Sequence, residues 1–394
     1  MKKRRVILIL LVLCGFTLSH AKPPEHFSVF FKDPIQARPS SGQTQNHELE
    51  ISVVNLLIAQ HELEDGEDHG HQFIELNLKP TQWSIYQEIQ WRIAELIPDE
   101  EKRPTLLLTL SESPEPENES GIGILGGMGP LADAELIQAL MNRLHASHKP
   151  VNWKRFAVHL LSAPPPRSWQ ATTGRGLTYL HRIGAFATQG YQRYYLASNT
   201  AHIHITGFKS LVRGTWISGA PRHSEFTVVD LVAHAAQSIE LSEPPLLVLS
   251  SKATYDARLY DHYLTQKGWT EAKLVTESHA SQAHAQGQFH LISSPAQAQA
   301  LQNAIDLAKA GQFEESHERI KAILISEIKH IQTPTGKLNI LLGCTELPLA
   351  LKGGAANELT LTLKNELGIE TQFIDTSQIF AEKIATDIVN LTEE

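Results

Sequence analysis

The chain has 394 residues, a formal net charge of −9, 42% hydrophobic residues and 20% charged residues. This length predicts two or three domains, and the composition excludes a chain that is disordered throughout. No apolar run reaches the roughly 20 residues of a membrane-spanning helix, which excludes a polytopic membrane protein. The acidic balance argues against a nucleic-acid partner.

Residues 1–21 have the pattern of a cleavable secretory signal. Four positively charged residues precede an apolar run over residues 6–13, and a small-x-small cleavage site ends at Ala21. We expect cleavage after Ala21 and export to the periplasm, with an uncleaved membrane anchor as the alternative. Cleavage removes Cys14 and leaves Cys344 as the single cysteine.

Residues 22–110 predict a small acidic α+β domain. The segment 22–120 holds 19 Asp or Glu against 7 Lys or Arg. Apolar patterning predicts strands over 49–59, 73–78 and 106–110 and a helix over 81–97. Residues 111–120 have the composition of a flexible linker. The His and acidic residues between 61 and 71 could bind a metal weakly, but the lack of a fixed ligand spacing favours a solvated loop.

From residue 121 onward, short apolar runs alternate with amphipathic stretches. The alternation predicts an α/β fold with parallel sheets, covering helices and a site at the carboxyl ends of strands. The expected strands are 122–125, 156–161, 194–197, 246–250, 274–275 and 338–342, and the expected helices include 131–144, 176–190 and 295–310.

Two glycine patterns follow each other at the start of this region. Residues 121–126 fit G-x-G-x-x-G, but the strand lies inside the pattern instead of before it, which disfavours a dinucleotide site. Residues 126–130, GGMGP, connect a strand to a helix. Their backbone N–H groups could bind a carboxylate or phosphate, and a tight turn alone is the alternative.

Two later segments, 194–202 and 339–347, share one pattern: an apolar strand, a small residue and then helix-capping side chains. Ser198 and Cys344 occupy matching places. We expect a helix dipole to lower the pKa of the Cys344 thiol, with a buried core cysteine as the alternative. His202 could tune Ser198, or it could only pack and form hydrogen bonds.

Three motifs in this order resemble those of the aspartate/glutamate racemase family: GILGGMGP at 123–130, NTAH at 199–202 and GCTELP at 343–348. The resemblance covers about residues 121–394. It implies two pseudo-symmetric α/β lobes, one of about 121–220 plus 373–394 and the other of about 221–372. It also implies a cofactor-independent site that uses two cysteines as acid and base.

The resemblance assigns Cys344 to the second catalytic cysteine and places Ser198 where the family has the first. The positions that it assigns to substrate binding are Met128, Gly129, Arg167, Asn199, Thr200, Ser251, Thr254, Lys309, Thr345 and Glu346. A thiol titrates near neutral pH, whereas an alcohol without a paired base does not. We therefore expect an enzyme that deprotonates one enantiomer well at Cys344 and the other poorly at Ser198.

These observations favour a racemase of an acidic amino acid, aspartate or glutamate. A decarboxylase or isomerase of a dicarboxylate on the same fold is one alternative, and a non-catalytic amino-acid-binding protein is another. We expect a small-molecule substrate, no cofactor, no metal ion at the site and a possible homodimer. The sequence assigns no role to residues 22–120.

Overall fold

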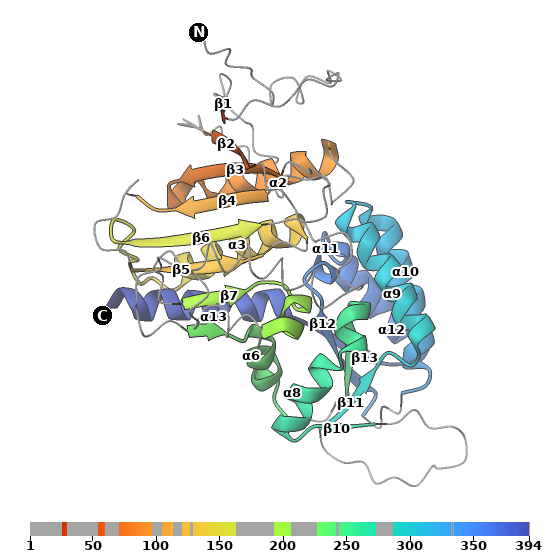
Figure 1. Cartoon of the computed structure of the whole chain (residues 1–394). Coiled ribbons are helices and arrows are strands. Elements are labelled where there is room, and N and C mark those ends of the chain that lie inside the picture. The colour runs from red at the N-terminus through yellow and green to blue at the C-terminus, as the bar shows by residue number, and fades with distance from the viewer. Residues whose placement is uncertain are drawn as a thin grey trace, which may run out of the picture. The chain divides into compact units, whose positions relative to one another are not determined.

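The computed structural model describes residues 26–29, 54–59, 71–96, 105–112, 120–126, 129–162, 193–205, 227–241, 244–272, 287–331, 333 and 335–393. The chain divides into two compact units, whose elements Figure 1 labels. Unit 1 consists of Met1–Tyr195, Leu211–Val228 and Ala385–Glu394, and unit 2 consists of Leu196–Ser210 and Val229–Ile384.

Unit 1 is built on an eight-stranded mixed sheet with the strand order β1-β2-β3-β4-β6-β5-β7-β8. Its strands are β1 (His26–Val29), β2 (Val54–Ala59), β3 (His71–Leu78), β4 (Thr105–Leu110), β5 (Ser120–Leu125), β6 (Phe156–Ser162), β7 (Arg193–Leu196) and β8 (Thr227–Val229). The pairs β3/β4 and β5/β6 are parallel, whereas β1/β2, β2/β3 and β4/β6 are antiparallel.

The N-terminal strands continue this sheet. Leu106 of β4 lies opposite Ser162 of β6, and Leu110 lies opposite Val158. The strands and helix predicted within 49–110 are present, and β3 and β4 with α2 (Trp83–Leu96) have the expected α+β composition. The proposed linker stays a prediction, because residues 113–119 lie outside the described residues.

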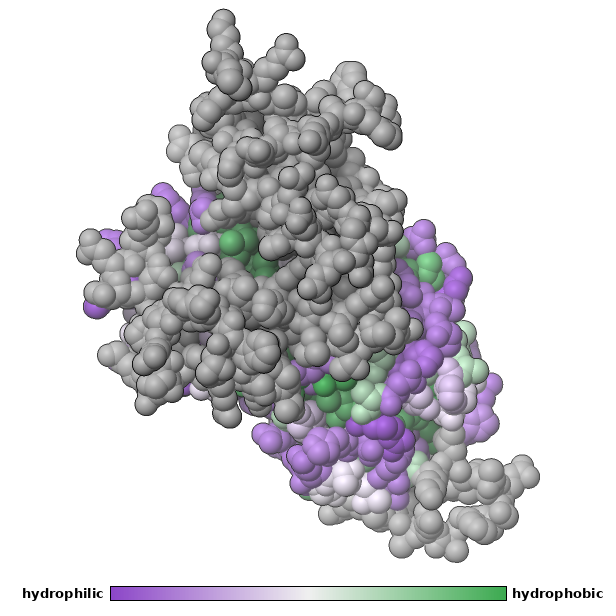
Figure 2. Space-filling view, viewed as in Figure 1, coloured by the Kyte–Doolittle hydropathy of each residue, from purple (hydrophilic) through white to green (hydrophobic). Residues whose placement is uncertain are grey.

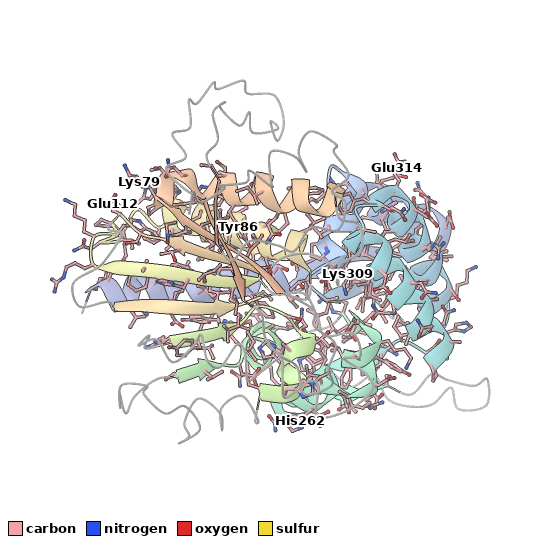
Figure 3. The ribbon with its side chains drawn as sticks, turned by 45° about the horizontal axis from the view of Figure 1, so that its top comes forward. Lys79, Tyr86, Glu112, His262, Lys309 and Glu314 are labelled. Carbon is pink, nitrogen blue, oxygen red and sulfur yellow. The ribbon has the colours of Figure 1, made fainter. Side chains whose placement is uncertain are left out.

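Helix α2 packs against α3 (Pro130–Ala146), both in unit 1. The short helix η1 (Pro80–Gln82) leads into α2. The apolar face of α2 buries Ile85 and Tyr86, and Figure 3 labels Tyr86 on this helix. Gln87 Nε2 donates to Gln138 Oε1 of α3 at 2.8 Å. The period-3.6 apolar pattern thus places a buried stripe where the two helices meet.

Unit 2 is built on a five-stranded sheet with the order β10-β11-β9-β12-β13, in which all neighbouring strands are parallel. The strands are β9 (Leu246–Ser250), β10 (Thr270–Glu271), β11 (Gln288–Leu291), β12 (Lys337–Gly343) and β13 (Glu370–Asp375). Ser250 lies opposite Gly343, and Leu342 lies opposite Asp375. The carboxyl ends of β9, β12 and β13 are therefore level with one another.

The core of unit 2 lies between this sheet and its helices. Leu249 and Ile340 of the strands cluster with Leu301, Leu324 and Leu359 of the helices. The helices are η3 (Thr200–His204), α6 (Leu231–Ser238), α7 (Lys252–Asp256), α8 (Leu259–Lys267), α9 (Pro295–Lys309), α10 (Phe313–Ile328), α11 (Leu347–Ala350), α12 (Ala355–Leu367) and α13 (Thr376–Glu393), which unit 1 shares. Along the right-hand edge of Figure 2 the surface is mainly hydrophilic. Among the described helices, none is both long and apolar enough to span a membrane.

The predicted α/β class is confirmed. The expected strands at 246–250 and 338–342 and the helix at 295–310 agree with β9, β12 and α9 to within one residue. The expected strand at 274–275 and helix at 176–190 lie outside the described residues. The expected return of the chain to the first lobe at 373 falls inside β13, which pairs with β12. Unit 1 instead resumes at Ala385, within α13.

Candidate active site

The candidate site gathers at the carboxyl edge of the parallel sheet of unit 2. Ser251 follows β9, Cys344 follows β12 and Thr376 follows β13. The turn that begins at Ser198 hydrogen-bonds to the same edge through Asn199 and Thr200. Sites of parallel α/β sheets lie at this edge, because the chain leaves the strands there and the loops can vary.

Three buried hydroxyl groups form a triangle at this edge. Thr200 Oγ1 is 2.8 Å from Ser251 Oγ and 3.2 Å from Thr254 Oγ1, and Ser251 Oγ donates to Thr254 Oγ1 at 2.9 Å. Ser251 also caps α7, because its Oγ accepts the N–H of Thr254. All three residues are predicted substrate-binding positions, and the structure brings them together.

Asn199 is fixed by a chain of hydrogen bonds across three elements. Its Oδ1 accepts from the Tyr260 hydroxyl at 2.5 Å. Its Nδ2 donates to Thr376 Oγ1 at 3.4 Å, and Thr376 in turn donates to the Leu342 carbonyl at 2.7 Å. Each donor in this series of hydrogen bonds has an acceptor, so the orientation of the Asn199 amide is fixed before a ligand binds.

Gly343 makes room for Tyr260. A Cβ atom at position 343 would lie 2.6 Å from the Tyr260 ring and 3.0 Å from the Leu249 carbonyl. Real Cβ atoms do not approach that closely, so the glycine before Cys344 is required by packing. Tyr260 is buried, and burial raises the pKa of its hydroxyl far above the usual value, which keeps it a hydrogen-bond donor.

The thiol of Cys344 donates a hydrogen bond to Glu346, with 2.9 Å between Sγ and Oε2. Thr345 Oγ1 donates to the same oxygen at 3.2 Å. Burial raises the pKa of the Cys344 thiol well above its usual value, and the charge of Glu346 and its hydrogen bond raise it further. The Lys309 ammonium acts in the opposite direction. The thiol is therefore protonated at neutral pH.

The predicted lowering of the Cys344 pKa by a helix dipole is wrong. The helix that follows, α11, has only four residues and starts at Leu347. One turn of helix carries a small partial charge, whereas Glu346 places a full negative charge at hydrogen-bond distance. Cys344 also belongs to the apolar core cluster of unit 2, so it combines a core position with a polar partner.

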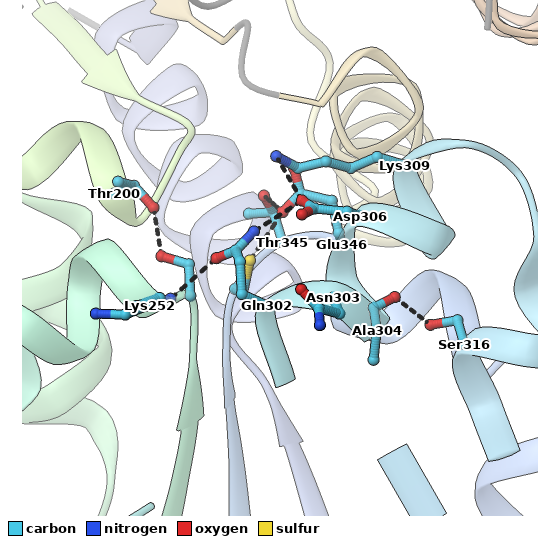
Figure 4. A network of polar contacts seen from close by, with 12 residues as sticks. Thr200, Lys252, Gln302, Asn303, Ala304, Asp306, Lys309, Ser316, Thr345 and Glu346 are labelled. Atoms are coloured by element: carbon cyan, nitrogen blue, oxygen red, sulfur yellow. Dashed lines mark hydrogen bonds and ion pairs between the residues drawn. The ribbon is translucent and has the colours of Figure 1, made fainter. Parts of the chain in front are cut away.

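Lys309 is held beside the thiol at the end of α9. Its side chain is 13% exposed, and Nζ lies 3.9 Å from Asp306 Oδ1. Asp306 accepts from Gln302 Nε2 at 2.8 Å, and Gln302 Oε1 accepts the backbone N–H of Lys252 at 2.9 Å. Figure 4 shows this chain of contacts between α7 and α9, with Lys309 beside the turn after β12.

His202 packs and forms hydrogen bonds with the backbone. The N–H of Leu231 donates to His202 Nε2 at 3.1 Å, so Nε2 carries no proton. His202 Nδ1 then carries the proton and donates to the Ser198 carbonyl at 2.9 Å. Both ring nitrogens form hydrogen bonds with backbone atoms. The alternative in which His202 acts as a base for the Ser198 hydroxyl is therefore not supported.

The glycine loop belongs to unit 1. Gly129 is the N-cap of α3 with an extended backbone, and Pro130 is the first residue of that helix. A Cβ at Gly126 would collide with the carboxylate of buried Asp133, which explains the glycine. Residues 121–125 lie within β5, so the G-x-G-x-x-G pattern falls inside a strand, as predicted. Met128 and Arg167 lie outside the described residues.

The predicted residues of unit 2 form two groups. One is the hydrogen-bonded triangle of Thr200, Ser251 and Thr254, beside Asn199, which hydrogen-bonds to Tyr260 and Thr376. In the other, Lys309 acts electrostatically on the hydrogen-bonded group of Cys344, Thr345 and Glu346. Sequence reasoning does not identify Tyr260 and Thr376, which orient Asn199. Thr376 begins α13 directly after a strand, and this position is the one feature of the sequence that could have indicated a role for it.

Known structures give the following similarities. An aspartate racemase from Picrophilus torridus is similar with 16% identity and a TM-score of 0.44, over 70% of this chain and 100% of that one. A glutamate racemase isoform from Bacillus anthracis is similar with 15% identity and a TM-score of 0.43, over 70% of this chain and 83% of that one. An allantoin racemase from Klebsiella pneumoniae is similar with 18% identity and a TM-score of 0.33, over 69% of this chain and 89% of that one.

The segments at 123–130, 199–202 and 343–348 resemble the motifs of the aspartate/glutamate racemases. No protein-family model matches the sequence, and no curated protein matches it either.

Proposed function

We propose that the protein is a cofactor-independent racemase of an acidic amino acid, aspartate or glutamate. The observation that supports it most is the buried Cys344–Glu346 pair at a strand end. In such a pair, the thiol can exchange a proton with a carbon atom. The carboxylate can in turn exchange a proton with the thiol. Together with the three racemase-like motifs, it favours proton transfer at Cα. Export to the periplasm, expected from residues 1–21, belongs to the same proposal.

The first proton transfer starts from the protonated thiol. Glu346 accepts the proton of Cys344 Sγ along the existing 2.9 Å hydrogen bond. The thiolate then removes the Cα proton of one enantiomer, so that the C–H bond breaks, an S–H bond forms and the electron pair stays on a planar carbanion. The Lys309 ammonium favours this step because it stabilises the thiolate.

The second proton transfer is assigned to Ser198. Its hydroxyl donates a proton to the opposite face of the carbanion, which inverts Cα. The resulting alkoxide regains a proton from water, and the hydroxide left behind takes up the proton that Glu346 accepted, which restores the starting state. Because the two ring nitrogens of His202 bind backbone atoms, His202 does not make Ser198 a base. An unassisted alcohol is a poor base, so the reverse direction is slow.

Substrate carboxylates have two sets of partners. The hydroxyl triangle of Thr200, Ser251 and Thr254 can turn its three O–H donors from one another toward a carboxylate. Lys309 supplies positive charge for a second carboxylate, and its partner Asp306 is 57% exposed at the side chain. This donor set fits a dicarboxylic amino acid better than an apolar one.

Incubation with L- and D-aspartate and L- and D-glutamate in D₂O tests the proposal. Cα deuterium is followed by NMR and chirality by chromatography. We expect exchange with inversion, at unequal rates from the two enantiomers, and loss of both in Cys344→Ala. No exchange in folded protein with a free thiol contradicts the proposal. Release of carbon dioxide from dicarboxylates would identify a decarboxylase, and binding without exchange a binding protein.

Ser198→Cys tests the assignment of the second group. A thiol at position 198 can act as a base, so we expect the slow direction to speed up by about tenfold or more while the fast direction changes less. Ser198→Ala is the matched control and keeps exchange without inversion. If Ser198→Cys changes both directions equally, Ser198 is not the group on the second face.

A further inference from the structure

A second group of ionisable side chains consists of residues that the proposed mechanism does not use. His317 and Glu318 come from α10, and Glu358 comes from α12. One ligand atom from each, a ring nitrogen or a carboxylate oxygen, lies within 4.8 Å of the other two. No spacing in the sequence indicates this group, because packing of α10 against α12 brings it together.

His317 provides an independent observation. Its side chain is buried, with the residue 7% exposed, and neither ring nitrogen has a hydrogen-bond partner in the described part of the chain. A buried polar atom without a partner costs free energy, and native structures rarely keep one. A ligand at the carboxylate pair would give this imidazole the partner that the protein does not supply.

The two helices hold these side chains firmly. Ser316 Oγ donates to the Ala304 carbonyl at 2.7 Å, a bond that Figure 4 shows, and it fixes α10 on α9 one residue before His317. Leu359, next to Glu358, is fully buried in the core of unit 2. The imidazole and one carboxylate therefore project from backbone that is set by core packing, which favours a preorganised site.

We propose that His317, Glu318 and Glu358 bind a divalent transition-metal ion of the zinc class. One imidazole nitrogen and two carboxylate oxygens are a three-ligand set that such an ion accepts, with water completing a tetrahedron. Magnesium and calcium prefer sets made only of oxygen, so the imidazole disfavours them. In the structure, Glu318 accepts a hydrogen bond from Lys321 Nζ at 3.4 Å. Glu318 gives up this bond when it binds the ion.

The site has a structural role. It links α10 to α12, and both helices cover the core around β12. An ion that binds only the folded chain stabilises it by mass action, so metal raises the melting temperature of the protein. This role is independent of the proposed racemase activity, and the two can fail separately.

Titration of the metal-free full-length protein with Zn²⁺ and Co²⁺ tests the proposal. We expect stoichiometric binding, a higher melting temperature with Zn²⁺ and a visible Co²⁺ spectrum without a sulfur charge-transfer band. Glu358→Gln should weaken binding at least tenfold, and Glu318→Gln with Glu358→Gln should abolish it. Both positions are exposed, so the variants fold. Glu366→Gln, an exposed change on the same helix, is the matched control and keeps binding.

Three results overturn the proposal. They are no binding by the wild-type chain, binding that survives in the double variant, and a sulfur charge-transfer band, which would move the ion to Cys344. Racemase assays of the double variant separate this inference from the proposed function, because activity should persist when metal binding is lost.

Discussion

At the residue scale, the side chain of Cys344 is a protonated thiol before substrate binds. Its burial and its hydrogen bond to Glu346 both favour the protonated form, against the smaller effect of Lys309. A buried thiol of this kind reacts slowly with alkylating reagents, because the thiolate is the nucleophile. If ligand binding transfers the Cys344 proton to Glu346, the thiolate that forms should react faster with these reagents.

Glu346→Gln tests the carboxylate as proton acceptor. The amide keeps the shape of the side chain but does not take up the Cys344 proton, so we expect kcat/KM for Cα exchange to fall by about 10²–10⁴-fold. Circular dichroism should show an unchanged fold. Glu314→Gln, an exposed change on α10, is the control and leaves the rate unchanged. An active Glu346→Gln enzyme would contradict the assignment.

Gly343→Ala tests the packing of Tyr260. The new Cβ would lie 2.6 Å from the Tyr260 ring, so the ring must move and Asn199 loses its partner. We expect a loss of about 1–3 kcal/mol in the free energy of unfolding, measured by urea denaturation. Adding Tyr260→Leu should recover part of that stability but not the orientation of Asn199. An unchanged Gly343→Ala protein would contradict this packing.

The residues of the candidate site could be predicted to a large extent, and their chemistry only in part. Thr200, Ser251 and Thr254 fall in recognisable positions and join in hydrogen bonds in the structure. The raised pKa of Cys344 could not be predicted, because it depends first on the burial of the thiol and then on the position of the Glu346 carboxylate. Tyr260 could not be predicted either, because its partner Asn199 is 61 positions away.

At the element scale, two strands each carry a histidine that the fold keeps neutral. Burial lowers the pKa of His290, on β11, to about 4, and burial also lowers that of His159, on β6, to about 4. His290 has no hydrogen-bond partner for either ring nitrogen among the described residues. The unfolded chain binds a proton at each site near the ordinary pKa of about 6.5.

These shifts predict acid sensitivity. A group with a lowered folded pKa stabilises the fold above its unfolded pKa, and this stability is lost as pH falls from about 6.5 to about 4. Each extra proton bound by the unfolded chain adds a slope of about 1.4 kcal/mol per pH unit. His290→Leu should flatten this slope in urea denaturation at pH 4.5–7. An unchanged slope in His290→Leu would contradict the account.

The elements themselves could be predicted better than their pairing. The apolar runs of β4 and β6 are plain in the sequence, and both form strands. Their antiparallel pairing is a contact between segments distant in the sequence, because β5 and α3 lie between the two strands in the chain. Local pattern fixes which face of a strand is buried, but it does not say which edge of a sheet the strand joins.

At the scale of the whole molecule, the last helix contributes to both units. Residues from Thr376 to Ile384 belong to unit 2, and those from Ala385 belong to unit 1. Within unit 1, buried Asp387 accepts from the Tyr195 hydroxyl at 2.7 Å and pairs with Arg193 at 3.3 Å. These contacts attach the end of α13 to β7.

Asp387→Asn tests this attachment. The amide loses the charge that pairs with Arg193 and one acceptor of the buried pair, so we expect a loss of about 1–3 kcal/mol of unfolding free energy. The exposed pair of Lys149 and Glu393 is the comparison on the same helix. Glu393→Gln should cost below about 1 kcal/mol, because water screens that pair. Equal costs for the two variants would show that burial of Asp387 adds nothing.

The division of α13 also has a consequence for the order in which the protein is made. Residues 385–393, which complete unit 1, are translated after every residue of unit 2. Strand β7, which ends at Leu196, is therefore made some 190 residues before the helix segment that contacts it. The contacts of Asp387 with Tyr195 and Arg193 can therefore form only after all of unit 2 has been synthesised.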